Sequence, residues 1–151
     1  MPTGKLKEYL DGQGVKYITI SHSKAYTAME VAESAHVKGK EMAKTVILKT
    51  DGKLAMAVLP ATQMVHVERL RKALGAGRVE IAEEQDFQGT FPGCEVGAMP
   101  PFGNLYGMEV LVDPRLAEDD EIAFNAGSHT ELMWLHYRDF ERLVQPKAIP
   151  L

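Results

Sequence analysis

Two apolar runs joined by the dipeptide Asp51-Gly52 limit the architectures open to this chain. The first run covers residues 44–49, and the second covers residues 54–59 and stops at Pro60. An Asp-Gly pair between such runs is the strongest short signal for a hairpin turn, because both positions tolerate positive φ angles. The second run is almost entirely apolar, which is typical of a strand buried on both faces. We therefore predict an antiparallel strand pair inside the core.

Strands and helices alternate along the remainder of the chain. β-branched, aromatic and alternating patterns predict further strands at residues 15–20, 78–82, 109–112, 121–124 and 130–137. Apolar spacing and capping signals predict helices at residues 5–10, 27–35, 67–74 and 137–143. This interleaving, together with hairpins that require antiparallel pairs, favours an α+β fold. We expect a single domain over residues 1–151, with a bent mixed β-sheet, partly barrel-like, and flanking helices.

The composition narrows the class of protein. A chain of 151 residues with 45% hydrophobic and 25% charged side chains suits one soluble domain. No apolar run approaches the roughly 20 residues that a membrane helix needs, and the first residues lack the apolar core of a secretory signal. Cys94 is the only cysteine, so an internal disulfide is excluded and the thiol is expected to be a bystander. We expect a cytoplasmic protein with no membrane partner.

Two segments are the best places for a functional site. Asn125, Gly127, Ser128 and His129 crowd into a small polar turn between two predicted strands. Strand ends hold side chains rigidly, and glycine lets the backbone approach a ligand closely. Residues 89–107 contain five glycines and three prolines, which indicates an ordered loop, and a loop of this length in a compact domain is usually functional. We therefore predict a site for a small substrate.

The same residues contain fragments of other catalytic patterns. His129 and Glu131 match the H-x-E pattern of zinc deaminases, but the accompanying P-C-x-x-C pair is missing, so no metal site is predicted. Ser128 and His129 are neighbours that point to opposite faces of a strand, so a serine nucleophile is not expected. Lys44 begins an otherwise apolar strand, and from the residues alone its ammonium either extends to solvent or points into a cleft.

Five groups of short motifs occur in an order that resembles the YbaK/EbsC family, which is related to the editing domain inserted in bacterial prolyl-tRNA synthetase. They read HSKAYTA at 22–28, HVKG at 36–39, AKTV at 43–46, GAMPPFG at 97–103, and VD at 112–113 followed by NAGSH at 125–129. Each motif alone is weak, but their order along nearly the whole chain is specific. The resemblance implies that family's fold, and a hydrolase that removes a wrong amino acid from mischarged tRNA without a metal or other cofactor.

The resemblance also assigns roles to residues. Lys44, Gly97 and His129 are the implied catalytic residues. Lys44 is expected to position the CCA end, and backbone N–H groups near Gly97 to stabilise the tetrahedral intermediate formed by an attacking water. No strong protein base is evident, so a free hydroxyl of the terminal adenosine is expected to assist. The implied substrate-binding residues are His22, Tyr26, Thr45, Pro101, Phe102, Asn125, Gly127 and Ser128.

The implied tRNA partner has to be reconciled with the charge of the chain. The net charge is −4, yet residues 1–50 carry eight lysines against five acidic residues. A basic strip that includes Lys24, Lys38 and Lys40 is our hypothesis for the tRNA-binding surface. A synthetase is a further implied partner. Two alternatives stay open: a non-catalytic module that binds aminoacyl ends or a synthetase, and a general small-ester hydrolase.

Overall fold

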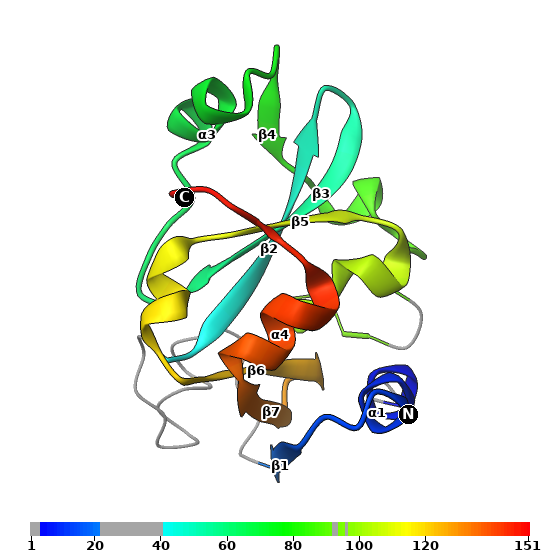
Figure 1. The fold of residues 1–151 in the computed structure, drawn as a ribbon. Helices are drawn as coiled ribbons and strands as arrows, with labels where there is room; N and C mark the ends of the chain where they lie inside the picture. The colour runs from blue at the N-terminus through cyan, green and yellow to red at the C-terminus, as the bar shows by residue number, and fades with distance from the viewer. Residues whose placement is uncertain (1–3, 22–40, 92–93, 96) are drawn as a thin grey trace.

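The computed structural model describes residues 4–21, 41–91, 94–95 and 97–151 (Figure 1). Within these ranges the strands are β1 (Tyr17–Ser21), β2 (Ala43–Thr50), β3 (Lys53–Pro60), β4 (Val79–Ile81), β5 (Glu109–Val112), β6 (Glu121–Ser128), β7 (Glu131–His136) and β8 (Lys147–Ala148). The helices are α1 (Gly4–Gly12), α3 (Val67–Leu74) and α4 (Tyr137–Val144), with 3₁₀ turns η1 (Glu84–Asp86), η2 (Gly103–Tyr106) and η3 (Pro114–Glu118). The predicted α+β class is confirmed.

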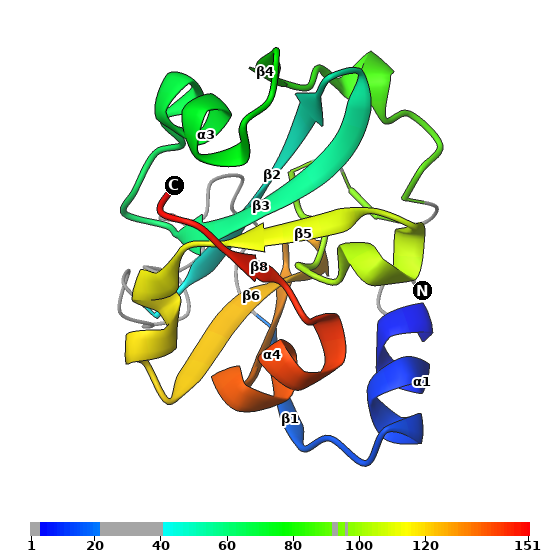
Figure 2. The same cartoon turned by 45° about the horizontal axis from the view of Figure 1, so that its top comes forward.

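A five-stranded sheet in the order β4-β2-β3-β5-β8 is built around the predicted hairpin. Asp51 and Gly52 connect β2 to β3 with φ angles of 49° and 83°, as a turn of this kind requires. The last six residues of β3 are all buried, which confirms the expectation of burial on both faces. β5 runs parallel to β3, so the sheet is mixed, and Figure 2 shows β5 lying between β3 and β8.

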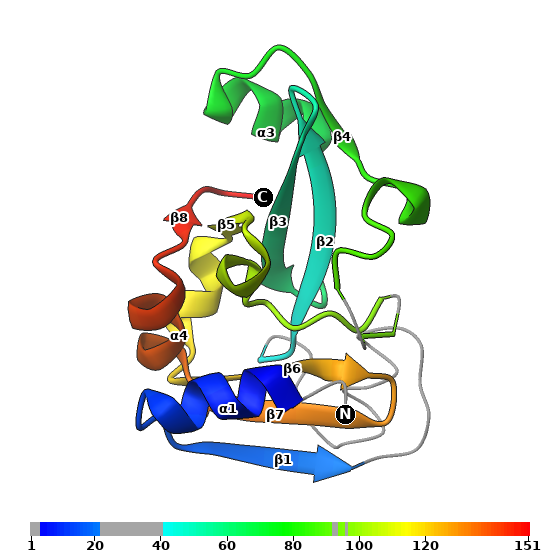
Figure 3. The ribbon, with the colours of Figure 1, turned by 90° about the vertical axis from the view of Figure 1, so that its right-hand side faces the viewer.

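A second, three-stranded antiparallel sheet has the order β1-β7-β6. In Figure 3, β2 and β3 rise away from this sheet, and the start of β2 reaches down to β6. The two sheets meet at a parallel bridge between Met42 and Ala123, where the N–H of Ala123 donates to the carbonyl of Glu41 at 3.0 Å. The predicted bent sheet is thus divided into two sheets, which this isolated bridge connects.

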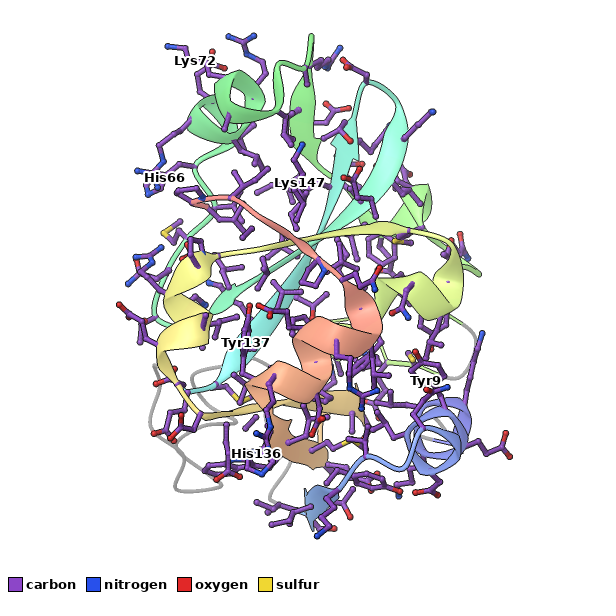
Figure 4. The ribbon with its side chains drawn as sticks, in the orientation of Figure 1. Tyr9, His66, Lys72, His136, Tyr137 and Lys147 are labelled. Atoms are coloured by element: carbon purple, nitrogen blue, oxygen red, sulfur yellow. The ribbon has the colours of Figure 1, made fainter. Side chains whose placement is uncertain are left out.

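The largest hydrophobic cluster lies between the sheets and is centred on aromatic rings. Phe102 is fully buried, and its ring centroid lies 5.7 Å from those of Phe124 and Phe140. Tyr9 extends from α1 toward this cluster, 6.5 Å from the Phe102 ring, and Tyr137 lies at the start of α4 (Figure 4). A separate cluster, with Leu70 of α3 at its centre, covers the other face of the five-stranded sheet.

Some elements differ from the predictions. β6 continues past residue 124 to Ser128, with a register shift between Asn125 and Ser128 that keeps the polar turn residues within the strand. β8 and η3 were not predicted. The predicted helix at residues 27–35 falls outside the described residues. Within the described ranges, every helix is too short or too polar to cross a membrane.

Candidate functional site

The site lies where β2 and β6 separate after the bridge that joins the two sheets. The bridge pairs Met42 with Ala123 in parallel, and two residues further along each strand come Lys44 and Asn125. Both residues line a cavity of about 130 Å³. Its described lining consists of Ala43, Lys44, Thr45, Gly97, Met99 and Asn125. Two sheets and the glycine–proline loop therefore each supply part of one chamber.

Two backbone hydrogen bonds hold the loop against β6. The N–H of Glu95 donates to the carbonyl of Gly127 at 2.8 Å, and the N–H of Gly127 donates to the carbonyl of Ala98 at 2.9 Å. Gly97, between these two contacts, has a φ of 84°, and Gly127 has a φ of 99°. Side chains rarely adopt these angles, so glycine is needed at both positions. The bonds fix Gly97 at the wall of the cavity.

His129 packs directly against Gly97. A Cβ built at position 97 would lie 3.5 Å from Cε1 of His129, so the imidazole occupies the space beside the bare glycine. Glu95 accepts a hydrogen bond from the backbone N–H of His129 at 3.3 Å, and the same carboxylate oxygen lies 3.8 Å from Nε2 of the ring. Glu95 was not predicted from the sequence. Its only signal was its place inside the glycine–proline loop.

Lys44 is a cation with little local compensation. Burial lowers the pKa of its ammonium group. In the part of the chain that the structure describes, no hydrogen bond or ion pair engages its Nζ atom, whereas Lys49 on the same strand binds Asp86 at 3.3 Å. A partly buried ammonium without a protein counterion is suited to bind an anionic or polar group of a ligand.

Asn125 contributes a second polar group to the cavity wall. The residue is 7% exposed, and within the described ranges its Oδ1 atom has no hydrogen-bond partner. Buried acceptors are nearly always paired, so an unpaired one beside a cavity calls for an explanation. Among the described residues, the site thus combines a cation without a counterion, an acceptor without a hydrogen-bond partner and a glycine at a positive φ angle.

Comparison with known proteins identifies the family. A model of the aminoacyl-tRNA editing domain matches residues 22–143, which is most of the chain. The chain belongs to the aminoacyl-tRNA editing domain family. Membership confirms the predicted resemblance and the predicted class of function, aminoacyl-tRNA deacylation.

Three relatives of this editing domain show how widely the match extends. This chain is 28% identical over 150 residues to "Multifunctional Ser/Thr-tRNA deacylase ProXp-y" of Escherichia coli, and the match covers 96% of this chain and 89% of that protein. It is 25% identical over 88 residues to a proline–tRNA ligase of Bacillus mycoides, which is 58% of this chain and 15% of the ligase. A crystal structure described as a candidate trans-editing enzyme for prolyl-tRNA synthetase superposes with a TM-score of 0.83 at 15% identity, covering 99% of this chain and 96% of that one.

The editing-domain structure brings some predicted site residues together and leaves others apart. Lys44, Thr45, Gly97 and Asn125 share the cavity, and His129 adjoins it through Gly97. Gly127 and Ser128 lie in the adjoining end of β6. Pro101 and Phe102 are buried and do not line the cavity, because the loop turns into the core after Met99. The predicted residues His22, Lys24, Tyr26, Lys38 and Lys40 lie outside the described residues.

The alternatives considered from the sequence gain no support from the geometry. Among the described residues, no group of three or more His, Cys, Asp or Glu side chains could hold a metal ion, and Figure 4 shows His66 and His136 far apart. Ser128 Oγ lies 3.3 Å from Thr130 Oγ1, which is not a base. Burial raises the pKa of the Cys94 thiol, which makes it a weaker nucleophile at neutral pH.

Proposed function

We propose that this editing domain hydrolyses the ester bond between a small amino acid and the terminal adenosine of a mischarged tRNA. The observation that carries the proposal is the cavity shared by Lys44, Gly97 and Asn125, which lie far apart in the sequence and belong to a chain of the editing family. The proposed mechanism gives every role to a group of this chain, of the tRNA or of water.

Lys44 acts as the anchor for the tRNA end. Its ammonium lacks a protein counterion among the described residues, so a phosphate or ribose hydroxyl of the CCA end would be its partner in the complex. A charge-assisted bond of this kind positions the ester at one place in the cavity. Positioning is a large part of catalysis, because it removes the entropic cost of bringing the reacting groups together.

The loop stabilises the charge that develops on the ester carbonyl. Gly97 and Met99 line the cavity, and neither backbone N–H donates a hydrogen bond to another described residue. Pre-oriented N–H groups of this kind form oxyanion holes in acyl-transfer enzymes. A water molecule attacks the carbonyl, and the free hydroxyl of the terminal adenosine accepts its proton and passes it to the leaving oxygen. His129 and Glu95 hold the loop wall behind Gly97.

The substrate is a small amino acid. The cavity, at about 130 Å³, is smaller than the roughly 300–1,000 Å³ of sites for drug-sized ligands. The relative in Escherichia coli is named a Ser/Thr-tRNA deacylase, which favours serine and threonine as first choices and alanine as the next. A second, small pocket is a standard solution when the synthetase itself cannot reject such amino acids.

The proposed partners follow from the reaction. The tRNA contacts the basic strip of Lys24, Lys38 and Lys40, and a prolyl-tRNA synthetase supplies the mischarged substrate, since a proline–tRNA ligase contains a related segment. The proposed location is the cytoplasm, where translation provides charged tRNA. The whole of residues 1–151 is proposed to act as one domain.

The test is deacylation of a panel of mischarged tRNAs by the wild type and by Lys44→Ala. The wild type should release at least one small amino acid, and Lys44→Ala should lower kcat/KM by about a hundredfold, as expected for the loss of a strong charge-assisted contact in a transition state. Lys53→Ala, which alters an exposed lysine of β3, is the matched control and should keep full activity.

Other outcomes would favour the alternatives. Tight binding of charged tRNA without turnover would indicate a binding module. Hydrolysis of simple activated esters that is unchanged in Lys44→Ala would indicate a general esterase.

A further inference from the structure

The amide of Asn125 is unusual among the buried polar groups of the described residues. Asp113, which is also buried, accepts hydrogen bonds from the side chain and backbone of Arg115 and from the N–H of Leu151. Ser128 accepts from the N–H of Thr130. Asn125 Oδ1 has no partner in the described part of the chain, and it is the only such group whose residue also lines the cavity with Lys44.

The surroundings of Asn125 do not require a polar residue. On its own face of the sheet, Asn125 pairs across the ladder with Leu132, a fully buried apolar residue, while Phe124 and Ala126 point to the opposite face. An aliphatic side chain at this position would avoid the cost of leaving a buried acceptor unpaired. The described residues therefore give Asn125 Oδ1 no partner, and a bound ligand would supply one.

Resting on the proposed function, we propose that Asn125 Oδ1 accepts a hydrogen bond from the α-amino group of the substrate. Rotation about the terminal torsion of asparagine is soft, so a small turn brings the oxygen to the cavity. The protein would then require a free amino group and reject esters whose nitrogen is acylated, such as N-formylaminoacyl- and peptidyl-tRNA. This makes it an editor of charged tRNA that spares tRNA already engaged in chain synthesis.

The α-amino group is the donor that suits this acceptor. In an aminoacyl ester the carbonyl and ester oxygens only accept hydrogen bonds, and the N–H groups of the loop are the proposed donors to the carbonyl. The α-amino group is the donor common to all aminoacyl esters. The hydroxyl of a serine or threonine side chain is the rival donor, and an alanine ester separates the two because it lacks that hydroxyl.

The experiment compares esters that differ only in the amino group. Alanyl- and seryl-tRNA are paired with propionyl- and 3-hydroxypropionyl-tRNA, and kcat/KM is measured for the wild type and for Asn125→Ala. Taking the ratio of variant to wild type for each ester cancels the different intrinsic reactivities of the substrates. Asn104→Ala, which alters the exposed asparagine of η2, is the matched control.

We expect Asn125→Ala to slow both aminoacyl esters about ten- to a hundredfold, and the deamino esters less than about threefold, as for the loss of one hydrogen bond to a charged or strongly polar group. The wild type should leave N-acetylalanyl-tRNA near its uncatalysed rate. Asn125→Asp, which keeps an acceptor in place, should retain the preference for amino esters. If Asn125→Ala does not fold by circular dichroism, Asn125→Leu replaces it, because leucine keeps the branched shape and lacks the acceptor.

Three results would overturn the inference. Equal slowing of amino and deamino esters would make Asn125 a structural residue, and slowing of the seryl ester alone would mean that it binds the side-chain hydroxyl. No slowing at all would remove any role in binding. Failure of the proposed function is a different result, because then the wild type itself hydrolyses none of the aminoacyl esters.

Discussion

The glycine–proline loop has two parts with opposite character. Around Gly103 the loop enters the core, where a Cβ would lie 2.9 Å from Cγ2 of Val110 and Phe102 is fully buried. Around Gly97 it borders a cavity, and the nearest atom to a Cβ there is His129 Cε1 at 3.5 Å. The first part is tightly packed, whereas the second borders a cavity where Asn125 Oδ1 has no hydrogen-bond partner among the described residues.

The difference separates what holds the fold from what performs the reaction. In the packed part every added atom must displace another, so a substitution changes the free energy of unfolding. In the open part a substitution changes which ligand is bound and how, with a smaller effect on stability. Met99 lies at the boundary, since it lines the cavity with Lys44 and also a neighbouring cavity of about 100 Å³ next to Phe91 and Cys94.

The largest effect is expected for Met99→Ala, which removes the side chain shared by the two cavities. Truncating a buried methionine costs about 2–5 kcal/mol, and this cost rises with the volume of the cavity that remains. The enlarged pocket should admit longer side chains, so hydrolysis of leucyl-tRNA should rise at least about tenfold relative to seryl-tRNA.

Met108→Ala is the matched control for that change, because Met108 is 7% exposed against 5% for Met99 and does not line the catalytic cavity. It should lose similar stability in chemical denaturation and keep the wild-type ratio of leucyl to seryl hydrolysis. If both variants broaden the substrate range alike, general loosening of the core is the cause and Met99 does not set the pocket size.

Gly103→Ala should have an intermediate effect, confined to stability. The new methyl would meet Val110, and that β-branched side chain is held in β5, so we expect a cost of about 1–3 kcal/mol. Gly12→Ala provides the comparison, because nothing lies within 4 Å of a Cβ at position 12. Urea denaturation measures both. Unchanged stability of Gly103→Ala would show that the core is not tightly packed at this point.

Gly97→Ala should have the smallest effect on stability and a clear effect on activity. The φ of 84° strains any side chain by about 1 kcal/mol or more, and the methyl would stand between His129 and the cavity. Gly89→Ala carries the same strain, at a φ of 81°, with open space around it. Both should lose similar stability, and only Gly97→Ala should lose about tenfold in deacylation. Equal activity of the two would remove Gly97 from the site.

The parts of the fold that follow from local chemistry could be predicted from the sequence. Asp51-Gly52 fixes a hairpin because few dipeptides adopt its angles, and the apolar run of β3 specifies burial on both faces. β8 has only two residues, and both are exposed. It forms because it pairs with β5, so no local sequence pattern predicts it. β6 was predicted to end at residue 124 because Asn125 and Gly127 resemble a turn, but the bulge lets the ladder continue.

The candidate site was predictable only in part. Motifs predict Lys44, Gly97 and His129 as site residues. Their spatial arrangement depends on how β2 and β6 pack, which the motifs do not specify. Met99 and Glu95 could not be identified, since their roles depend on how the loop is pressed against β6 by Gly127. Phe102, an aromatic residue beside a motif, is fully buried in the core, and the sequence does not distinguish such a position from one that lines a cavity.

The bridge between Met42 and Ala123 has a consequence for inactivation by heat. Lys44 and Asn125 line the proposed site from different sheets, so its geometry depends on contacts between the sheets. Warming that loosens these contacts would abolish hydrolysis while each ladder of hydrogen bonds is still intact. On heating, loss of deacylase activity should therefore be detected at a lower temperature than loss of the far-ultraviolet circular dichroism signal.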